Sequence, residues 1–538
     1  MKKAATIIAA VVTALCSAQG ALAHEGPGSP PARKPPEQLG KVHFPTSCSP
    51  AVEKQFERAM ALLHSFWAGD AIKAFNAVLQ QDPGCAIAYW GIAVALQQNP
   101  LTGQQPNPKA TEDALAGLEK ARTIGAKTQR ERDYLAAIEL IYKDADSIVF
   151  PSRRLAYEKA MEALAQRYPN DPEAATFYAL ALQMTALLTD KTYANQLKSA
   201  AILERIVKDQ PEHPGVVHYL VHAYDYPAIA DRGLSAARLY ARIAPNHPHA
   251  LHMPSHIYTR LGMWQDSIDT NRRSAAAAKA EGNGQEQAHA MDYLVHAHLQ
   301  LGQDAEAHRI VSEALAITTI NPAIFIGHYA TAAMPARHAL ERRAWKDAIA
   351  LKPRPTRFLF PDAITHFARG LGYARTGDVA SAKVEELELA KLVDQLAGQK
   401  NTYWSKQTEV QQVAVGAFIA LAQGNRDEAL KSMQAAADLE DSMEKHIVTP
   451  GPVVPARELL GEMLLEVARS AEALQAFESS AQREPNRLRG LYGAARAAEM
   501  SGNREKAKMY YAKFVALTEK SDGARTELQR ARAYLAQR

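Results

Sequence analysis

The sequence predicts an all-α fold built from repeated helix hairpins. After about residue 50, apolar residues recur at intervals of three and four, alanine is abundant, and strand-like alternation is scarce. Small residues spaced five apart also recur. The matched pairs are Gly262 and Ser267, Gly302 and Ala307, Gly377 and Ala382, Gly424 and Ala429, Ala468 and Ala473, and Gly502 and Ala507, with a looser copy at Phe66 and Ala71. We interpret the first member as the point where two antiparallel helices approach near a turn, and the second as the point where the second helix presses on the first.

One pair of copies gives the length of the repeat. Two segments match at proline, histidine and tyrosine positions, and every match is offset by 34 residues. The matched sets are Pro211, His213, Pro214, His218, His222 and Tyr224, and then Pro245, His247, Pro248, His252, His256 and Tyr258. This offset is the length of a tetratricopeptide repeat. We therefore predict a right-handed α-solenoid of tetratricopeptide-like helix hairpins over residues 48–538, with the first helices lining its concave face.

The N-terminal segment predicts export. Lys2 and Lys3 precede an apolar run over 4–14, and Ala21-Leu22-Ala23 supplies the small-x-small pattern of a signal peptidase site. We predict a signal peptide over 1–23 and a periplasmic or secreted chain; an uncleaved anchor is the alternative. Residues 24–47 are rich in proline and predict a disordered arm.

Two cysteines follow the predicted signal peptide. Cys48 and Cys85 are 37 residues apart, about one repeat, and each precedes a predicted helix. Because adjacent helix starts lie close together in a hairpin solenoid, an oxidising compartment favours a disulfide between them. Two free buried thiols are the alternative.

Composition excludes several classes of function. With 62 Lys and Arg against 58 Asp and Glu, the net charge is +4, too small for an electrostatic nucleic-acid footprint. We expect no membrane span in the mature chain. The sequence has no Walker loop, no Gly-x-Ser-x-Gly, no His-Glu-x-x-His and no dinucleotide fingerprint.

A column of histidines gives the strongest functional signal. When the repeats are aligned on the small-residue turn, three successive first helices carry His or Asp followed four residues later by His. The pairs are His218 and His222, His252 and His256, and Asp292 and His296. Residues four apart share one helix face, and neighbouring helix axes run about 8–10 Å apart, so these side chains can converge. Paired imidazoles with a carboxylate suit Cu or Zn.

The residues near this column have predicted supporting roles. Asp225 follows His222 by three and is a candidate ligand or an acceptor behind a ligand. Asp292 is the other candidate anionic ligand. Tyr224, Tyr258 and His298 fall two residues after the second member of each pair and are candidates to orient the ligands. We read His64, His247 and His249 as packing or capping residues.

Other readings of the column stay open. Each histidine can simply hydrogen-bond within the groove. Glu458 and Glu462 occupy the same register, ten and six residues before Ala468, so Glu458 is a candidate general base of a metal-dependent enzyme. The groove can also hold a small-molecule ligand or a protein partner, as an interaction scaffold does.

The chain also resembles a family of exported bacterial tetratricopeptide-repeat proteins. Four motifs carry the resemblance: DPGCAIAYWG at 82–91, HYLVHAYD at 218–225, HALHMPSHI at 249–257 and PGPVVPARELLG at 450–461. It covers most of the mature chain. The resemblance implies the fold and export, and it does not imply an activity.

Overall fold

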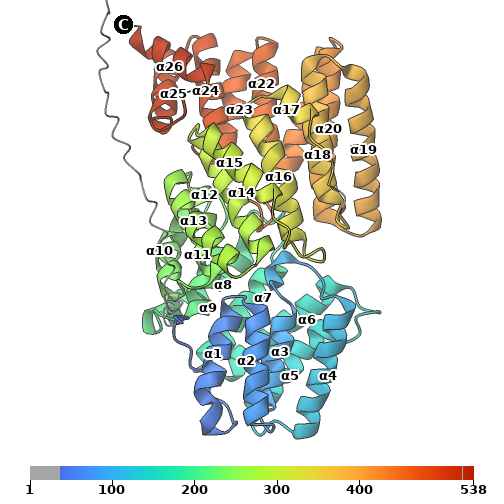
Figure 1. The fold of residues 1–538 in the computed structure, drawn as a ribbon, viewed down its shortest axis with the longest axis vertical. Helices are drawn as coiled ribbons and strands as arrows, with labels where there is room; N and C mark the ends of the chain where they lie inside the picture. Colours follow the sequence, from blue (N-terminus) through green and yellow to red (C-terminus); the bar gives the residue numbers. More distant parts are fainter. Residues whose placement is uncertain (1–36, 355, 524, 538) are drawn as a thin grey trace, which may run out of the picture. The chain divides into compact units, whose positions relative to one another are not determined.

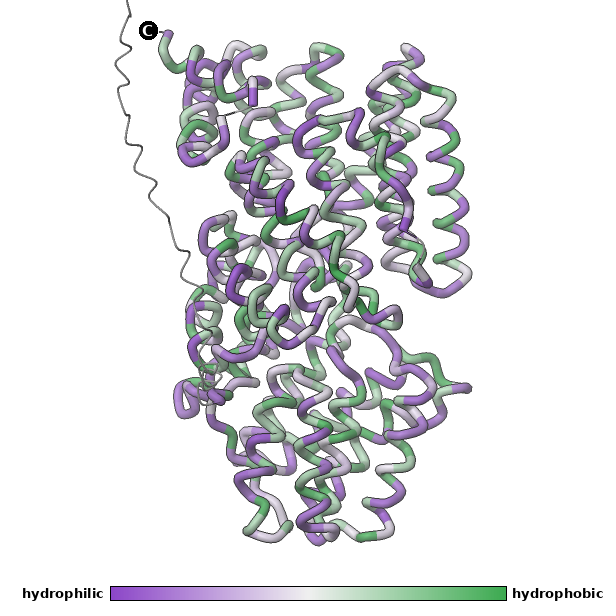
Figure 2. Tube along the Cα trace, viewed as in Figure 1, coloured by the Kyte–Doolittle hydropathy of each residue, from purple (hydrophilic) through white to green (hydrophobic). Residues whose placement is uncertain are grey.

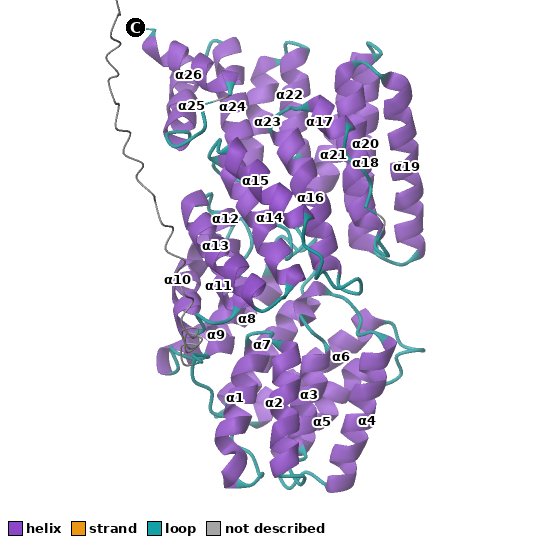
Figure 3. Cartoon of the chain, in the orientation of Figure 1, coloured by secondary structure: helices purple, strands orange, loops and turns teal. Residues whose placement is uncertain are grey.

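The regular elements in the described part of the chain are all helices. The computed structural model describes residues 37–354, 356–523 and 525–537, and it holds 26 α-helices and three short 3-10 helices (Figure 3). The predicted signal peptide and most of the predicted arm lie outside these residues.

The first part of the chain forms short antiparallel helices (Figure 1). They are α1 (Glu53–His64), α2 (Ala68–Gln81), α3 (Ile87–Leu96), α4 (Pro108–Ile124), α5 (Gln129–Tyr142), α6 (Phe150–Arg167), α7 (Pro172–Thr185) and α8 (Ala194–Asp209), with 3-10 turns η1 (Pro50–Val52) and η2 (Pro100–Thr102).

The middle part carries the predicted histidine column. Its helices are α9 (Pro214–Ala223), η3 (Ala230–Gly233), α10 (Leu234–Ile243), α11 (Pro248–His252), α12 (Pro254–Arg260), α13 (Trp264–Ala280), α14 (Gly284–Gln300), α15 (Asp304–Leu315), α16 (Phe325–Glu341) and α17 (Trp345–Ile349).

The last part continues the same pattern. Its helices are α18 (Leu359–Thr376), α19 (Val379–Gly398), α20 (Thr402–Ala422), α21 (Arg426–Asp441), α22 (Ala456–Glu466), α23 (Ser470–Arg483), α24 (Leu488–Met500), α25 (Arg504–Leu517) and α26 (Thr526–Ala536).

Consecutive helices pack as hairpin pairs, which confirms the predicted all-α helical-repeat fold. Hydrophobic and hydrophilic residues interleave along each helix in Figure 2, so each helix buries one side against its neighbours. Residues 38–538 form one compact unit. Within it, α1 packs on α9 as well as on its sequence neighbours, so the first hairpin lies next to the histidine column. In the described residues no helix is long and apolar enough to cross a membrane.

The repeated small residues work partly as predicted. Gly377, Gly424 and Gly502 adopt φ of 87°, 84° and 78°, and a Cβ at each meets nothing within 4 Å. Glycine is therefore needed there for the left-handed turn and not, as expected, for close approach. Gly262 combines both reasons, because its φ is 64° and a Cβ would lie 2.6 Å from the Pro485 carbonyl oxygen. The second member of each pair is buried between its helices, as predicted.

Two features near the start of the unit bear on the predictions. Cys48 and Cys85 form a disulfide. Residues 38–47 have no helix, but Leu39, Val42 and Phe44 are buried, so this part of the predicted disordered arm is packed. Apolar side chains hold this segment in place, because Phe44 packs against the rings of Phe56 and Trp90 in the first hairpins.

Candidate metal centre

Six histidines gather in one buried cluster in the middle of the chain. Helix α9 supplies His218 and His222, α11 supplies His249 and His252, α12 supplies His256, and α14 supplies His289. Their exposed fractions lie between 0 and 9%. Proline shapes the local backbone: Pro254 ends α11 and starts α12, because proline has no N–H to continue a helix and is favoured in a first turn. His252 and His256 therefore lie on either side of a helix break.

The cluster divides into two triads, which we call triad A and triad B. Triad A is His218, His222 and His249, and triad B is His252, His256 and His289. Within each triad, one ligand nitrogen from each ring lies within 4.8 Å of the others. The hydrogen bonds of each triad show which ring nitrogens are free to bind an ion.

The hydrogen bonds of triad B fix two of its tautomers. Asn271 donates from Nδ2 to the Ser267 carbonyl oxygen (2.8 Å), which leaves its Oδ1 to accept from His252 Nδ1 (2.7 Å). His256 Nδ1 lies 2.8 Å from a carboxylate oxygen of Asp225, which accepts its proton. Both rings therefore carry their proton on Nδ1 and a lone pair on Nε2.

Those two lone pairs face each other. The Nε2 atoms of His252 and His256 are 3.1 Å apart. Two acceptors at this distance repel unless a proton or a cation lies between them. A shared tetrahedral ion with M–N bonds of about 2.0–2.1 Å holds two nitrogens about 3.3 Å apart, close to the observed distance.

In triad A, too, buried ring nitrogens lack a suitable hydrogen-bond partner. His218 donates from Nδ1 to the His64 carbonyl oxygen (2.7 Å), so its Nε2 lone pair faces His249 Nε2 at 3.2 Å. Among the described residues, neither ring nitrogen of His222 has a hydrogen-bond partner, although the ring is buried. A buried polar atom without a partner is costly, which points to a ligand or ion that completes the site.

Aromatic rings enclose both triads. Tyr240 stacks under His218 at 4.9 Å between ring centroids, and Phe66 lies 4.5 Å from the same ring. Tyr293 packs edge-on against His252 at 4.6 Å and donates its hydroxyl to the Thr449 carbonyl oxygen. This apolar shell restricts water and rotation of the imidazoles.

Burial keeps the imidazoles neutral. It is the main cause that lowers the pKa of His218, His222 and His252 well below the usual value, and the neighbouring imidazoles lower it further. The same causes lower the pKa of His289 to about 3, although Glu286 opposes them. Neutral imidazole is the form that binds a metal ion, so both triads are competent ligands at neutral pH.

Asp225 supports the centre from behind. One carboxylate oxygen accepts from His256 Nδ1 and from Lys445 Nζ (3.1 Å), and the other accepts from Arg260 Nε (2.9 Å). Despite its burial, the ammonium of Lys445 and the guanidinium of Arg260 hold the pKa of Asp225 well below its usual range. Asp225 is not a member of either triad; its carboxylate faces His256 Nδ1, Lys445 and Arg260.

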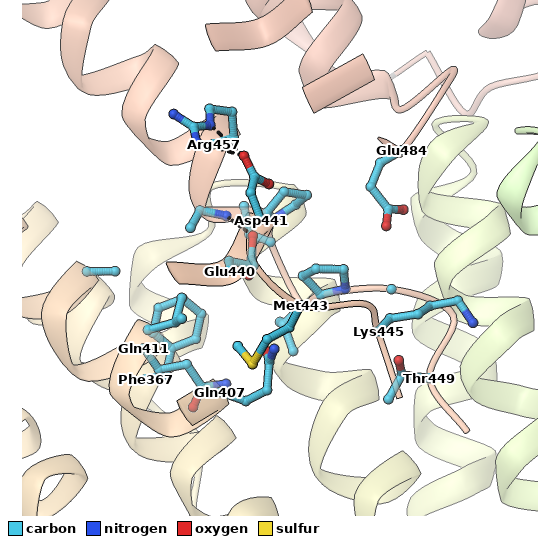
Figure 4. A pocket seen from close by; sticks show the side chains of 18 of the residues that line it. Phe367, Gln407, Gln411, Glu440, Asp441, Met443, Lys445, Thr449, Arg457 and Glu484 are labelled. Atoms are coloured by element: carbon cyan, nitrogen blue, oxygen red, sulfur yellow. Dashed lines mark hydrogen bonds and ion pairs between the residues drawn. The ribbon is translucent and has the colours of Figure 1, made fainter. Parts of the chain in front are cut away.

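The segment 442–455, between α21 and α22, closes the centre from the C-terminal part of the chain. Glu444 N donates to the Leu188 carbonyl oxygen, Lys445 reaches Asp225, and the Thr449 and Pro452 carbonyl oxygens accept from α14 and α16 side chains. A cavity of about 60 Å³ lies beside this segment. In Figure 4 the Lys445 side chain extends away from Phe367 and Gln411, which line another part of the same cavity.

Only some side chains of the predicted histidine column come together in the structure. Its first two pairs converge, whereas Asp292 and His296 belong to a separate group around Arg337. The Arg337 guanidinium lies 3.5 Å from the Asp292 carboxylate and 3.4 Å from His296 Nδ1. Burial raises the pKa of Asp292 to about 6. Neither residue belongs to a triad, and among the described residues both Asp292 carboxylate oxygens and His296 Nε2 have no hydrogen-bond partner.

The predicted supporting residues also lie elsewhere. Tyr224 donates to Glu204, and His298 Nδ1 bonds the Gln303 side chain, so neither orients a triad ligand. Among the described residues, Tyr258 makes no ring contact or side-chain hydrogen bond with a triad histidine. Glu458 is held by Arg487 at 2.8 Å, in a separate buried ion cluster.

Two triad members escaped the sequence prediction. His249 and His289 each lie three residues before the first member of an aligned pair, so they form a column of their own. The equivalent residue in α9 is Gly215, where a Cβ would lie 2.2 Å from the His64 ring. The shared spacing of His249 and His289 was therefore enough to predict that both face the same site as the aligned pairs.

A third histidine group serves the packing. Glu173 accepts from His64 Nε2 (2.9 Å) and His213 Nε2 (2.7 Å), and the other nitrogens of the two rings bond Tyr219 and the Val216 amide. Every ring nitrogen is satisfied, so this group needs no ion.

Comparison with known proteins supplies no family. No protein-family model matches the sequence, and no curated protein matches it. Among solved structures, human IFIT1, solved as a dimer with PPP-AAAA, is similar with 13% identity and a TM-score of 0.38, over 80% of this chain and 90% of that one. A chain of the Naa15/Naa10 complex bound to HypK-THB has 11% identity and a TM-score of 0.24, over 89% of this chain and 90% of that one. These scores carry no argument about function.

Proposed function

We propose that this protein binds copper or zinc through the buried histidine triads. One observation carries the proposal: the Nε2 atoms of His252 and His256 are 3.1 Å apart, and each bears a lone pair. The Nδ1 atom of each ring holds the proton, because it donates to Asn271 in His252 and to Asp225 in His256. An ion between them removes the repulsion. Nitrogen donors favour these borderline metals over magnesium or calcium, which prefer oxygen.

The supporting shell has the form of a metal site. Ligating histidines usually donate their other ring N–H to a carboxylate or carbonyl-type oxygen, which fixes their orientation. His256 does so to Asp225, His252 to Asn271, and His218 to the His64 carbonyl. We further propose that the chain is exported, which the disulfide supports, since disulfides persist in oxidising compartments.

Metal analysis of the purified, tag-free protein tests this function. After stripping with a chelator, loading with Zn or Cu and desalting, we expect about one metal equivalent or more to remain. His252→Ala with His256→Ala should lose the ion of triad B. His338→Ala is the matched control, because it removes a largely buried imidazole outside both triads. Retention below about 0.2 equivalents by a wild-type protein with native circular dichroism would overturn the proposal.

A further inference from the structure

The two triads share one buried space. His222 of triad A lies 5.7 Å from His256 of triad B between ring centroids, and His249 lies 6.3 Å from His252. These distances are as short as the one between His222 and His249 within triad A, which is 6.4 Å. Ions held by the two triads are therefore close neighbours.

Each triad is incomplete as a coordination shell. Three imidazole nitrogens leave a tetrahedral ion with one open position, as in zinc sites that keep a water or substrate. The polar surroundings do not fill it. Asp225 is turned to His256, Arg260 and Lys445, and Glu286 Oε2 lies 3.9 Å from His249 Nδ1.

The charge of the centre calls for an anion. Six neutral imidazoles contribute no charge, and the single charge of Asp225 already faces the cations of Arg260 and Lys445. Two divalent ions would add four positive charges to this buried space, where Glu286 is a further carboxylate and Glu444 and Glu484 face Arg260. A buried charge is costly unless it is paired, so the site favours a small anion that enters with the metal.

We infer that triads A and B form one dinuclear centre, in which two metal ions are bridged by a small exogenous anion of the hydroxide or azide class. The inference rests on the proposed metal binding. The residues are His218, His222 and His249 at one ion and His252, His256 and His289 at the other. The bridging anion fills both open positions and offsets the charge of both ions.

Copper(II) and azide test the inference. The loaded protein should hold about two copper ions per chain. Magnetic coupling through the bridge should make the integrated EPR signal clearly smaller than that of the same amount of isolated copper(II). Titration with azide should saturate at about one azide per copper pair, seen as a new charge-transfer absorption band.

Two variants make the test specific. His222→Ala and His289→Ala each weaken one triad, so each should retain about one copper with its full EPR signal. His338→Ala should behave as the wild type. Two coppers with full EPR intensity, azide bound once per copper, or a single copper in the wild type would each overturn the dinuclear centre and leave metal binding intact. A wild type that retains no copper would instead overturn the proposed function.

Discussion

The histidine pairs of α9 and α11–α12 and the glutamates of α22 occupy the same register of the repeat but behave differently. Glu458 is buried like the histidines, and Glu462 is partly buried, with 12% of its side chain exposed. Arg487 Nε lies 2.8 Å from Glu458, and Arg489 and Arg343 each lie 2.6 Å from Glu462. Each glutamate therefore has a complementary charge, whereas His252 and His256 present lone pairs to each other and His222 presents nitrogens with no partner at all.

The difference shows that the neighbours of one repeat position decide whether its buried polar side chains find partners. In both regions the hairpin geometry places two polar side chains four residues apart at the inner face of the repeat. In the C-terminal region the adjacent hairpins supply the arginines that complete the pair, and the result is structural. In the middle region the adjacent hairpins supply more imidazoles, and under the proposed function a cation completes the cluster.

Removing Arg487 should have the largest effect on stability. Arg487→Ala leaves Glu458 and Glu341 buried without their shared cation, and breaking a buried ion pair costs about 3–5 kcal/mol. Urea denaturation should show this loss, with metal content unchanged. In the metal-free protein, His252→Ala should lower the free energy of unfolding by less, because it also removes the repulsion between the two Nε2 lone pairs. An equal loss in both variants would contradict the distinction between the two regions.

Metal should stabilise only the middle region. An ion at about 100 times its dissociation constant adds about 2.7 kcal/mol to the free energy of unfolding. We expect this gain in wild type and in the His338→Ala control, measured by thermal denaturation with and without Zn. The double variant His252→Ala with His256→Ala should show no gain, and a full gain there would assign the ion to another site.

On acidification, the two regions should lose stability over different pH ranges. The pKa values of His252 and His289 lie below the unfolded value of 6.5. The unfolded chain therefore binds protons before the folded chain does, and stability falls as the pH drops below 6.5. For His289, with a pKa of about 3, the loss is roughly 2 kcal/mol between pH 6.5 and pH 5. Arg343 and Arg489 lower the pKa of Glu462 to about 2, so its contribution is lost only as the pH falls from about 4.5 towards 2.

Hydrogen exchange measures directly whether the two regions lose stability at different pH. In the metal-free protein at pH 5, amide protection should fall in α9, α11 and α12 before it falls in α22 and α24. Bound metal should delay the change in the middle region, because protons and metal compete for the same nitrogens. Simultaneous loss of protection in both regions would show that the two clusters do not respond separately.

The sequence predicted the hairpin repeat and four of the six triad histidines, because both follow from periodicity. It could not predict which neighbour each buried side chain would meet. Asp292 and His296 match the histidine register, yet they lie beside Arg337 of α16, more than one repeat away along the chain, and not in a triad. Lys445 comes from an irregular segment 220 residues beyond Asp225, and no spacing rule relates the two.

Asn271 offers the smallest and sharpest test of the middle region. Its amide fixes the His252 tautomer without touching the proposed ion, since Nδ2 is held by Ser267 and Oδ1 accepts from His252. Asn271→Ala should lower metal affinity by about 10–100-fold, the usual effect of losing such a partner, and should leave the stoichiometry unchanged. Competition with a chromophoric chelator measures this affinity. Asn271→Asp, which restores an acceptor for His252 Nδ1, should recover most of it, and that recovery distinguishes orientation of the ligand from a general loss of packing.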